Sequence, residues 1–400
     1  MTSRERVRAV LSHKLPDRIP NGLGGCETAG MHVLTYDKLQ RVLGGDPTPP
    51  RLDTFMANAV FEEDVISKMD GDIILLDSPH MCKSRLRGEV ADEWKPQRLW
   101  GKRFSVSVRE YFSEADDGTI SWDSRGIVCP KGAFYFDKPH PTSLNVDLII
   151  PDPDTIKPRD SIDEGILCHM EKEAKRLYEE SDLSICVGEI VVNLNCCPGG
   201  FANTMMLMIE EPDVMHEILD KHVDAAIKQL KLLDQAVGKY VDLAAIAHDF
   251  GDNRGVTIGD RLWREIYKPH YKRLFDTWHS VTDMKINLHS CGSVSAILDD
   301  LIECGVDVIN PVQTSAEGMS SESLKERFGD RIVFWGGAYD AQLFGANMSY
   351  DEVYDAVRRE LEVFKKGGGY IFSGTHNLPA EMPEHHVKAF MDSYFAAREY

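Results

Sequence analysis

One stretch of the sequence, KINLHSCG at residues 285–292, joins a predicted strand to a predicted helix. An apolar run ends at Leu288, and a helical pattern follows over residues 294–304. Residues two apart in an extended strand point to the same side. We therefore expect His289 and Cys291 to leave the end of one strand together, which suits a borderline-soft ion such as Zn²⁺.

Similar apolar runs recur along the chain, and most are followed by a helical pattern. The predicted strands are 18–23, 72–76, 184–192, 241–247, 285–289, 306–311, 332–335 and 370–373. The predicted helices between them include 212–237, 261–279, 294–304 and 350–366. Continuous apolar strands that alternate with amphipathic helices are typical of a parallel sheet with helices outside it. Eight such units favour an α/β fold of the closed (β/α)₈ TIM-barrel type, and an open doubly wound sheet is the alternative.

Residues 1–400 are predicted to form one barrel domain, since barrels of this type often run long. Residues 79–153 break the alternation with turn signals and short alternating runs, so we predict a β-rich subdomain inserted after the second strand and lying over the barrel mouth. Its aromatic side chains either line a pocket for a flat apolar ligand or pack the core of the insertion itself. They are Trp94, Trp100, Tyr111, Phe112, Trp122, Phe134, Tyr135 and Phe136.

The composition is that of an ordinary globular protein, with 42% hydrophobic and 28% charged residues. A net charge of −20 argues against binding to nucleic acid or to an anionic membrane surface. No apolar stretch approaches the ~20 residues that a spanning helix needs, so we expect no membrane segment. Nine irregularly spaced cysteines and the lack of a signal peptide predict a reduced, cytoplasmic protein. P-loop, dinucleotide-binding and esterase motifs are absent.

Polar residues follow the C-terminal ends of the predicted strands, where a barrel of this type builds its active site. We predict that His289, Cys291 and His376 bind a metal ion, because three protein ligands and one open position are typical of catalytic zinc. The alternative is that His289 donates to a backbone carbonyl and Cys291 packs as a small buried hydrophobe. The predicted substrate-binding residues are His248, Asp252, Asn310, Gln313, Trp335 and Tyr339.

Two acidic residues are the candidate catalytic acids. Glu189 interrupts an apolar strand, where a carboxyl group must be paired or protonated. It would serve as a general acid, a metal ligand or a partner for a substrate hydroxyl, and an ion pair with Lys285 is the alternative. Asp249 is the second candidate, and a structural role in the loop before the helix at Arg261 is its alternative.

Several motifs occur in a fixed order along the chain. They are SRERV at 3–7, PDRIP at 16–20, HSCGSV at 289–294, GVDVINPVQ at 305–313, FWGG at 334–337 and GGYIF at 368–372. This ordered set resembles the uroporphyrinogen decarboxylase superfamily over nearly the whole chain. The resemblance implies a (β/α)₈ barrel.

Two branches of that superfamily differ after the first strand. The decarboxylases carry an arginine-rich segment there that holds substrate carboxylates, whereas this chain reads GLGGCE at 22–27. The resemblance therefore favours the methyltransferases that work with corrinoid proteins. Their zinc site uses His-x-Cys and a later cysteine. His289 and Cys291 match the motif, and His376 lies where the later cysteine is expected.

The resemblance implies the methyltransferase component of an O-demethylase. Such an enzyme would use Zn²⁺ and move a methyl group from an aryl methyl ether of the guaiacol, veratrole or vanillate type to the Co(I) corrinoid (cobalamin) of a partner protein. Imidazole in place of thiolate makes zinc a stronger Lewis acid, which suits an ether oxygen. The alternatives are methyl transfer between a methylated corrinoid protein and a thiol such as coenzyme M, transfer from a methylamine-type donor, uroporphyrinogen-type decarboxylation, and a non-catalytic tetrapyrrole or corrinoid carrier. A homodimer is left open.

Overall fold

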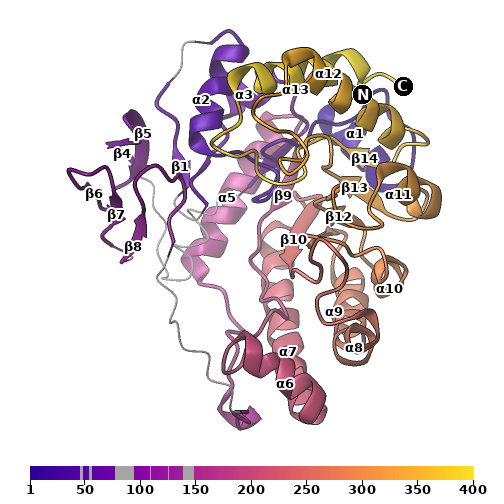
Figure 1. The fold of residues 1–400 in the computed structure, drawn as a ribbon. Coiled ribbons are helices and arrows are strands. Elements are labelled where there is room, and N and C mark those ends of the chain that lie inside the picture. The colour runs from indigo at the N-terminus through magenta and orange to yellow at the C-terminus, as the bar shows by residue number, and fades with distance from the viewer. Residues whose placement is uncertain (46–47, 54–55, 77–93, 109, 125, 138–147) are drawn as a thin grey trace.

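Parallel strands form a closed barrel in the computed structural model, which describes residues 1–400 except 46–47, 54–55, 77–93, 109, 125 and 138–147 (Figure 1). Within those residues the barrel sheet has seven strands, in the order β14-β13-β12-β11-β10-β9-β3. They are β3 (Ile73–Leu75), β9 (Ser184–Val187), β10 (Leu243–Ala247), β11 (Lys285–His289), β12 (Val308–Asn310), β13 (Val333–Trp335) and β14 (Tyr370–Ile371). All of their pairings are parallel, as predicted.

A single residue closes the barrel between β3 and β14. Asn21 forms parallel bridges to Gly71, beside β3, and to Phe372, beside β14. A Cβ added to Gly22 would lie 2.6 Å from the indole nitrogen of Trp335, so only glycine lets the chain approach this closely. The predicted first strand is thus reduced to one paired residue, and the predicted closed barrel is confirmed over the predicted alternative of an open sheet.

A buried carboxylate fixes the closing segment. The Asp72 side chain is fully buried and accepts hydrogen bonds from Arg6 Nη1 at 2.6 Å, from Arg18 Nη1 at 2.7 Å and from the backbone N–H of Asn21 at 2.7 Å. Arg18 also forms an antiparallel bridge to Glu399. The first and last parts of the chain therefore meet at this side of the barrel.

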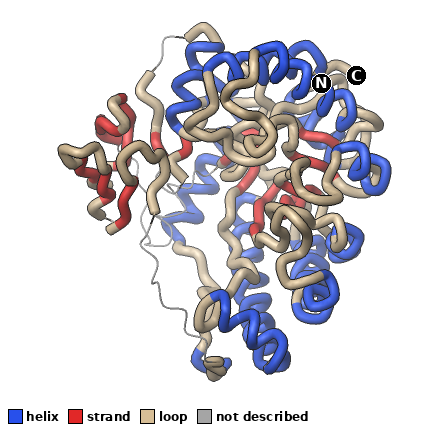
Figure 2. Tube along the Cα trace, in the orientation of Figure 1, coloured by secondary structure: helices blue, strands red, loops and turns tan. Residues whose placement is uncertain are grey.

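Helices surround the strands (Figure 2). They are α1 (Ser3–Leu11), α2 (Val33–Val42), α3 (Glu63–Lys68), α5 (Glu164–Glu180), α6 (Phe201–Glu210), α7 (Pro212–Val237), α8 (Asp260–Ile266), α9 (Lys268–Val281), α10 (Leu298–Cys304), α11 (Ser321–Phe328), α12 (Tyr350–Phe364) and α13 (Glu384–Ala397). None of the helices in the described ranges combines the length and the apolar character that a bilayer-spanning segment requires.

The predicted helix boundaries hold in part. Helix α7 spans the predicted residues 212–237, and α12 begins at the predicted residue 350, where Ser349 and Glu352 form a capping box. The predicted helix 261–279 is two helices, α8 and α9, because Pro269 lacks the N–H that a continuous helix would use. The predicted helix 294–304 begins only at Leu298.

The predicted β-rich region contains two small antiparallel sheets (Figure 1). They comprise β4 (Trp94–Leu99) with β5 (Lys102–Ser107), and β6 (Phe112–Glu114) with β7 (Ile120–Trp122) and β8 (Ile127–Cys129). A separate pair is β1 (Leu52–Asp53) with β2 (Asn58–Ala59), and a short 3₁₀ helix, η1, spans Pro153–Thr155. Segments 77–93 and 138–147 lie outside the described residues, so the bounds 79–153 and the place over the barrel mouth stay a prediction.

Aromatic residues pack the core of this β-rich region, which was one of the two alternatives. The ring of Phe136 lies 5.9 Å from Trp100, 5.7 Å from Phe112 and 5.8 Å from Trp122 between centroids. Tyr135 contacts the main body, where its hydroxyl accepts a hydrogen bond from the Ala380 backbone N–H at 3.3 Å.

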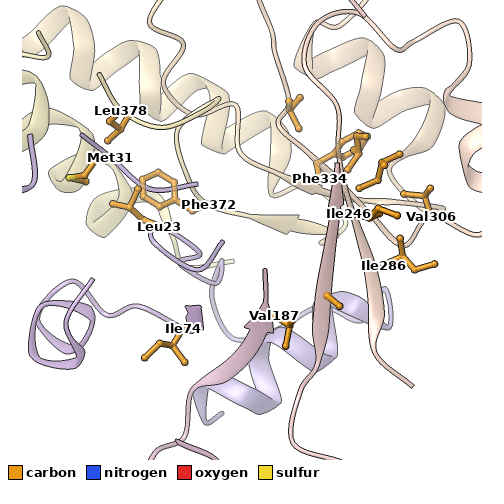
Figure 3. Packing of buried hydrophobic residues seen from close by; sticks show 14 of the residues in the cluster. Leu23, Met31, Ile74, Val187, Ile246, Ile286, Val306, Phe334, Phe372 and Leu378 are labelled. Carbon is orange, nitrogen blue, oxygen red and sulfur yellow. The ribbon is translucent and has the colours of Figure 1, made fainter. Parts of the chain in front are cut away.

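Residues of the barrel strands alternate between two buried apolar clusters. Ile74, Val187, Ile286 and Phe334 belong to the larger cluster, which includes the apolar faces of the helices (Figure 3). The intervening residues form a separate inner cluster: Ile73, Cys186, Leu243, Val308, Val333, Trp335 and Ile371, with Cys26 and part of α1. This two-sided burial explains why the strands read as continuous apolar runs, and it leaves their C-terminal ends free to carry polar groups.

Candidate functional site

The structure brings the three predicted metal ligands together at the C-terminal end of the barrel. His289 is the last residue of β11, Cys291 lies two residues further along the chain, and His376 lies in the loop after β14. Their ligand atoms all lie within 4.8 Å of one another. The His289 Nε2 atom is 3.4 Å from Cys291 Sγ, and the two imidazole centroids are 5.2 Å apart.

A hydrogen bond fixes the tautomer of His289. Its Nδ1 atom lies 2.9 Å from Asn310 Oδ1, and Thr28 Oγ1 donates to the same oxygen at 2.7 Å. The amide nitrogen of Asn310 faces the Trp335 carbonyl at 3.3 Å, which can only accept, so the amide oxygen must face the histidine. His289 therefore carries its hydrogen on Nδ1 and directs the Nε2 lone pair toward Cys291. Its partner is a side-chain amide, not the backbone carbonyl of the predicted alternative.

Burial keeps these ligands uncharged in the metal-free protein. It lowers the pKa of His289, and it lowers the pKa of His376 to about 4, with His289 as a further cause. Burial and the neighbouring Asp249 carboxylate raise the pKa of the Cys291 thiol to about 12. Both imidazoles thus offer a free lone pair at neutral pH, whereas the thiol must lose its proton when it binds a cation.

The turn after Cys291 depends on glycine. Gly292 has a φ of +79°, and a Cβ there would lie 2.5 Å from the carbonyl of Gly251. The backbone N–H of Cys291 donates to Asp249 Oδ1 at 2.9 Å, and that of Gly292 donates to Gln313 Oε1 at 2.9 Å. Contacts from the neighbouring loops therefore hold Cys291 in place.

A cavity of about 670 Å³ lies beside Cys291 and His376. Three predicted substrate-binding residues line it: Asp252, Gln313 and Tyr339. The lining also includes Asn253, Asp340 and Asn377, which are among the polar residues that follow the predicted strands. Arg254 and Gln342, which the sequence did not single out, line it as well, together with the apolar Pro311, Leu378 and Pro379. This volume and mixed lining are typical of a site for a small organic molecule.

The other three predicted substrate-binding residues are not among the residues that line this cavity. His248 is buried with its Nδ1 atom 2.8 Å from the hydroxyl of Tyr271 in α9, and burial lowers its pKa to about 3. Asn310 is fully buried, where it contacts the Nδ1 atom of His289, and Trp335 is fully buried in the inner cluster. Contact of these three residues with substrate stays a prediction.

A pair of glutamates lies at the end of β9. The backbone N–H of Glu189 donates to Glu27 Oε2 at 3.0 Å, and a Cβ on Gly188 would lie 2.5 Å from Glu27 Oε1. Burial and the charges of Glu27 and Asp249 raise the pKa of Glu189 to about 8, so it carries a proton at neutral pH. The predicted alternative, an ion pair with Lys285, is not formed, because Lys285 pairs with Asp307 at 3.1 Å.

The sequence places Glu27 among the polar residues that follow the first predicted strand, but it did not predict the contact of Glu27 with Glu189. The residue lies far from Glu189 along the chain, and only the closed barrel brings them together. One signal is present in the sequence: a glycine directly before Glu189 leaves room that a side chain would fill. The roles of Glu189 and Asp249 as catalytic acids stay predictions.

The comparisons with known proteins agree on one family. The uroporphyrinogen decarboxylase (URO-D) family model matches residues 195–396, just over half of the chain and the part that carries all three predicted metal ligands. The "Uroporphyrinogen decarboxylase" of Methylococcus capsulatus is 23% identical over 202 residues, covering 48% of this chain and 51% of that protein. The "Methylcobamide:CoM methyltransferase MtaA" of Methanosarcina barkeri is 26% identical over 202 residues, covering 48% and 52%.

The chain spans about half the length of the curated relatives it matches. A solved structure described as a methyltransferase from Methanosarcina mazei superposes with a TM-score of 0.54 at 16% identity, over 99% of both chains. That likeness shows a shared fold over the whole length. With the family model matching the half of the barrel that holds His289, Cys291 and His376, the chain belongs to the uroporphyrinogen decarboxylase family.

Proposed function

We propose that this protein is a zinc-dependent methyltransferase that moves a methyl group from an aryl methyl ether to the Co(I) corrinoid of a partner protein. The observation that carries the proposal is the His289–Cys291–His376 cluster beside a cavity for a small molecule. Imidazole and thiolate are both ligands that zinc binds well, and three protein ligands with an open fourth position are the arrangement of catalytic zinc. A bound zinc ion would act there as a Lewis acid toward the ether oxygen.

The residues after the first strand favour methyl transfer over tetrapyrrole decarboxylation. The segment at 22–27 contains no arginine, and its Glu27 carboxylate packs against the end of β9 beside Glu189. A polycarboxylate substrate would meet like charge at this place, in a chain that already carries a net charge of −20. A small neutral or singly charged donor avoids that repulsion.

The leaving group sets the chemical demand on the site. A phenol has a pKa of ~10, like that of Tyr, so protonation of the departing phenolate at pH 7 contributes ~4 kcal/mol. Glu189 holds a proton at neutral pH and is the proposed donor to that oxygen. As the methyl carbon bonds to the acceptor, the electron pair of the C–O bond goes to the phenolate oxygen, and Glu189 supplies the proton.

The test is methyl transfer to a free acceptor. The zinc-loaded protein is mixed with guaiacol and chemically reduced cob(I)alamin, and the loss of Co(I) absorbance is followed together with the release of catechol. Activity in the wild type and its loss in Cys291→Ala support the proposal. Failure with guaiacol, veratrole and vanillate alike overturns it.

A second candidate is methyl transfer between a methylated corrinoid protein and a thiol such as coenzyme M. The 26% identity to a protein named methylcobamide:CoM methyltransferase favours this candidate. His376 in place of a cysteine argues for the ether, because a neutral ligand leaves more positive charge on the metal. Methylcobalamin with 2-mercaptoethanesulfonate tests it, and formation of the thioether without ether activity would establish the second candidate.

A further inference from the structure

We propose that Arg254 binds an oxyanion, a carboxylate or a sulfonate, on the small molecule that occupies the cavity beside Cys291 and His376. The identity of that molecule rests on the proposed function. The anion site rests on the loop that carries Arg254 and on the charges around it.

Arg254 lies in a hairpin, residues 250–257, that follows β10 and lines the cavity. The side chain of Asp252 holds this turn, because its Oδ1 atom accepts the backbone N–H of Arg254 at 2.7 Å and that of Gly255 at 3.1 Å. The backbone that presents the guanidinium is therefore fixed before any ligand arrives.

The hairpin is also attached to the neighbouring barrel loops. The backbone N–H of Ser293 donates to the carbonyl of Asp252 at 2.7 Å, and Gln313 Nε2 donates to Asn253 Oδ1 at 2.6 Å. Both contacts reach the loops that hold Cys291. The backbone of this hairpin is therefore ordered before a ligand binds, so binding restricts only the exposed side chain of Arg254.

Arg254 is the cationic side chain of the cavity lining that can attract an anion. Among the described lining residues it is the one with a permanent positive charge, and no ion pair of its guanidinium is found within the described ranges. The lining carboxylate of Asp340 is engaged by the hydroxyl of Ser315 at 2.7 Å and the backbone N–H of Gln342 at 2.9 Å. The carboxylate of Asp252 accepts hydrogen bonds from the backbone of its own loop. Both acids keep their negative charge, but within the described residues neither forms an ion pair with Arg254, so its guanidinium is available to a ligand.

The guanidinium geometry defines the ligand class. Its planar fork pairs with a carboxylate or sulfonate through two parallel hydrogen bonds, which a neutral hydroxyl or methoxy group cannot form. For the proposed ether donor this predicts a methoxybenzoate such as vanillate over guaiacol. For a thiol acceptor it predicts 2-mercaptoethanesulfonate over 2-mercaptoethanol. Vanillate and 2-mercaptoethanesulfonate both carry an oxyanion group, and they differ in the rest of the molecule.

Calorimetric titration of the zinc-loaded protein tests this without any methyl transfer. The probes are two matched pairs that differ by the anion: vanillate with guaiacol, and 2-mercaptoethanesulfonate with 2-mercaptoethanol. We expect at least one charged probe to bind about 10-fold more tightly than its neutral partner. Arg254→Gln should bring that ratio close to one without weakening the neutral probe, and Arg254→Lys should restore part of it.

Arg261→Gln is the matched control, because Arg261 is a highly exposed residue of α8 that does not line the cavity. Equal binding of charged and neutral probes in both pairs, or an anion preference that survives in Arg254→Gln, overturns the inference. A preference lost only in Arg254→Gln supports it, and the pair that shows the preference identifies the source of the anion. If that preference is found in a protein that demethylates no ether, the proposed function fails and the anion site stands.

Discussion

The side-chain oxygen of Asn310 lies 2.9 Å from Nδ1 of His289, and the two residues are register partners in the parallel pairing of β11 with β12. The ladder that holds the barrel together therefore also orients a candidate metal ligand. A histidine held this way binds metal through a preselected nitrogen.

Replacing Asn310 tests that orientation. In Asn310→Ala, His289 loses its acceptor, and we expect the zinc affinity to fall by about 10- to 100-fold. Asn310→Asp keeps an acceptor at the same place and should bind zinc nearly as well as the wild type. Competition with a chromophoric chelator measures both variants. An unchanged affinity in Asn310→Ala would mean that the hydrogen bond does not control the site.

Removing the thiolate tests the metal site directly. We expect Cys291→Ala to lose its zinc after purification without added metal, since two neutral imidazoles alone hold the ion weakly. Cys197→Ala is the control, because Cys197 is an exposed cysteine outside the cluster and should leave the zinc content unchanged. Elemental analysis of the two proteins gives the answer. Full zinc occupancy in Cys291→Ala would be incompatible with the proposed ligand set.

The ligand pKa values predict how zinc binding depends on pH. Because the pKa of the Cys291 thiol is raised to about 12, zinc must displace its proton throughout the neutral range. The pKa of His376 is lowered to about 4, so this imidazole is already unprotonated above pH 6. Binding should therefore release about one proton per zinc and weaken roughly tenfold for each unit that the pH falls.

Calorimetry in buffers of different ionisation enthalpy measures this proton count at pH 7. A count near zero would show that Cys291 is already a thiolate in the metal-free protein or is not a ligand.

The acid role of Glu189 predicts the pH profile of methyl transfer. Burial and the charges of Glu27 and Asp249 raise the pKa of Glu189 to about 8, so the proton-bearing form prevails below that pH, and activity should fall as the pH rises through it. Glu189→Gln should lose about 100-fold in kcat with guaiacol. The loss should be much smaller with 4-nitroanisole, whose leaving phenolate needs little protonation. Equal losses with both donors would exclude Glu189 as the proton donor.

The network around Asp72 predicts a large effect on stability. Asp72→Ala leaves Arg6 and Arg18 without their buried partner, and we expect a loss of about 3–5 kcal/mol in the free energy of unfolding. Glu265→Ala breaks an exposed pair with Arg261 and should change stability by less than about 0.5 kcal/mol. Urea unfolding followed by circular dichroism compares the two. Similar midpoints would show that the Asp72 network contributes little.

The sequence was sufficient where the physical cause is local. Alternation of apolar runs with helical patterns predicted the barrel, and the positions of His289 and Cys291 at a strand end predicted that they lie together. The split between α8 and α9 was missed, although Pro269 marks it. The pairing of Glu27 with Glu189 is a contact between segments distant along the chain, which no local pattern encodes. The proposed role of Arg254 depends on a cavity that loops from several strands form together.

The one-residue closure at Asn21 also constrains the order of folding during synthesis. Its partners, Gly71 and Phe372, are separated by most of the chain. While the chain grows from the ribosome, the Asn21 segment can pair with Gly71 beside β3, but its other side and each newest strand stay unpaired sheet edges until β14 emerges. A nascent protein of this topology is thus exposed to edge-to-edge aggregation through most of its translation, and a chaperone that covers strand edges would protect it.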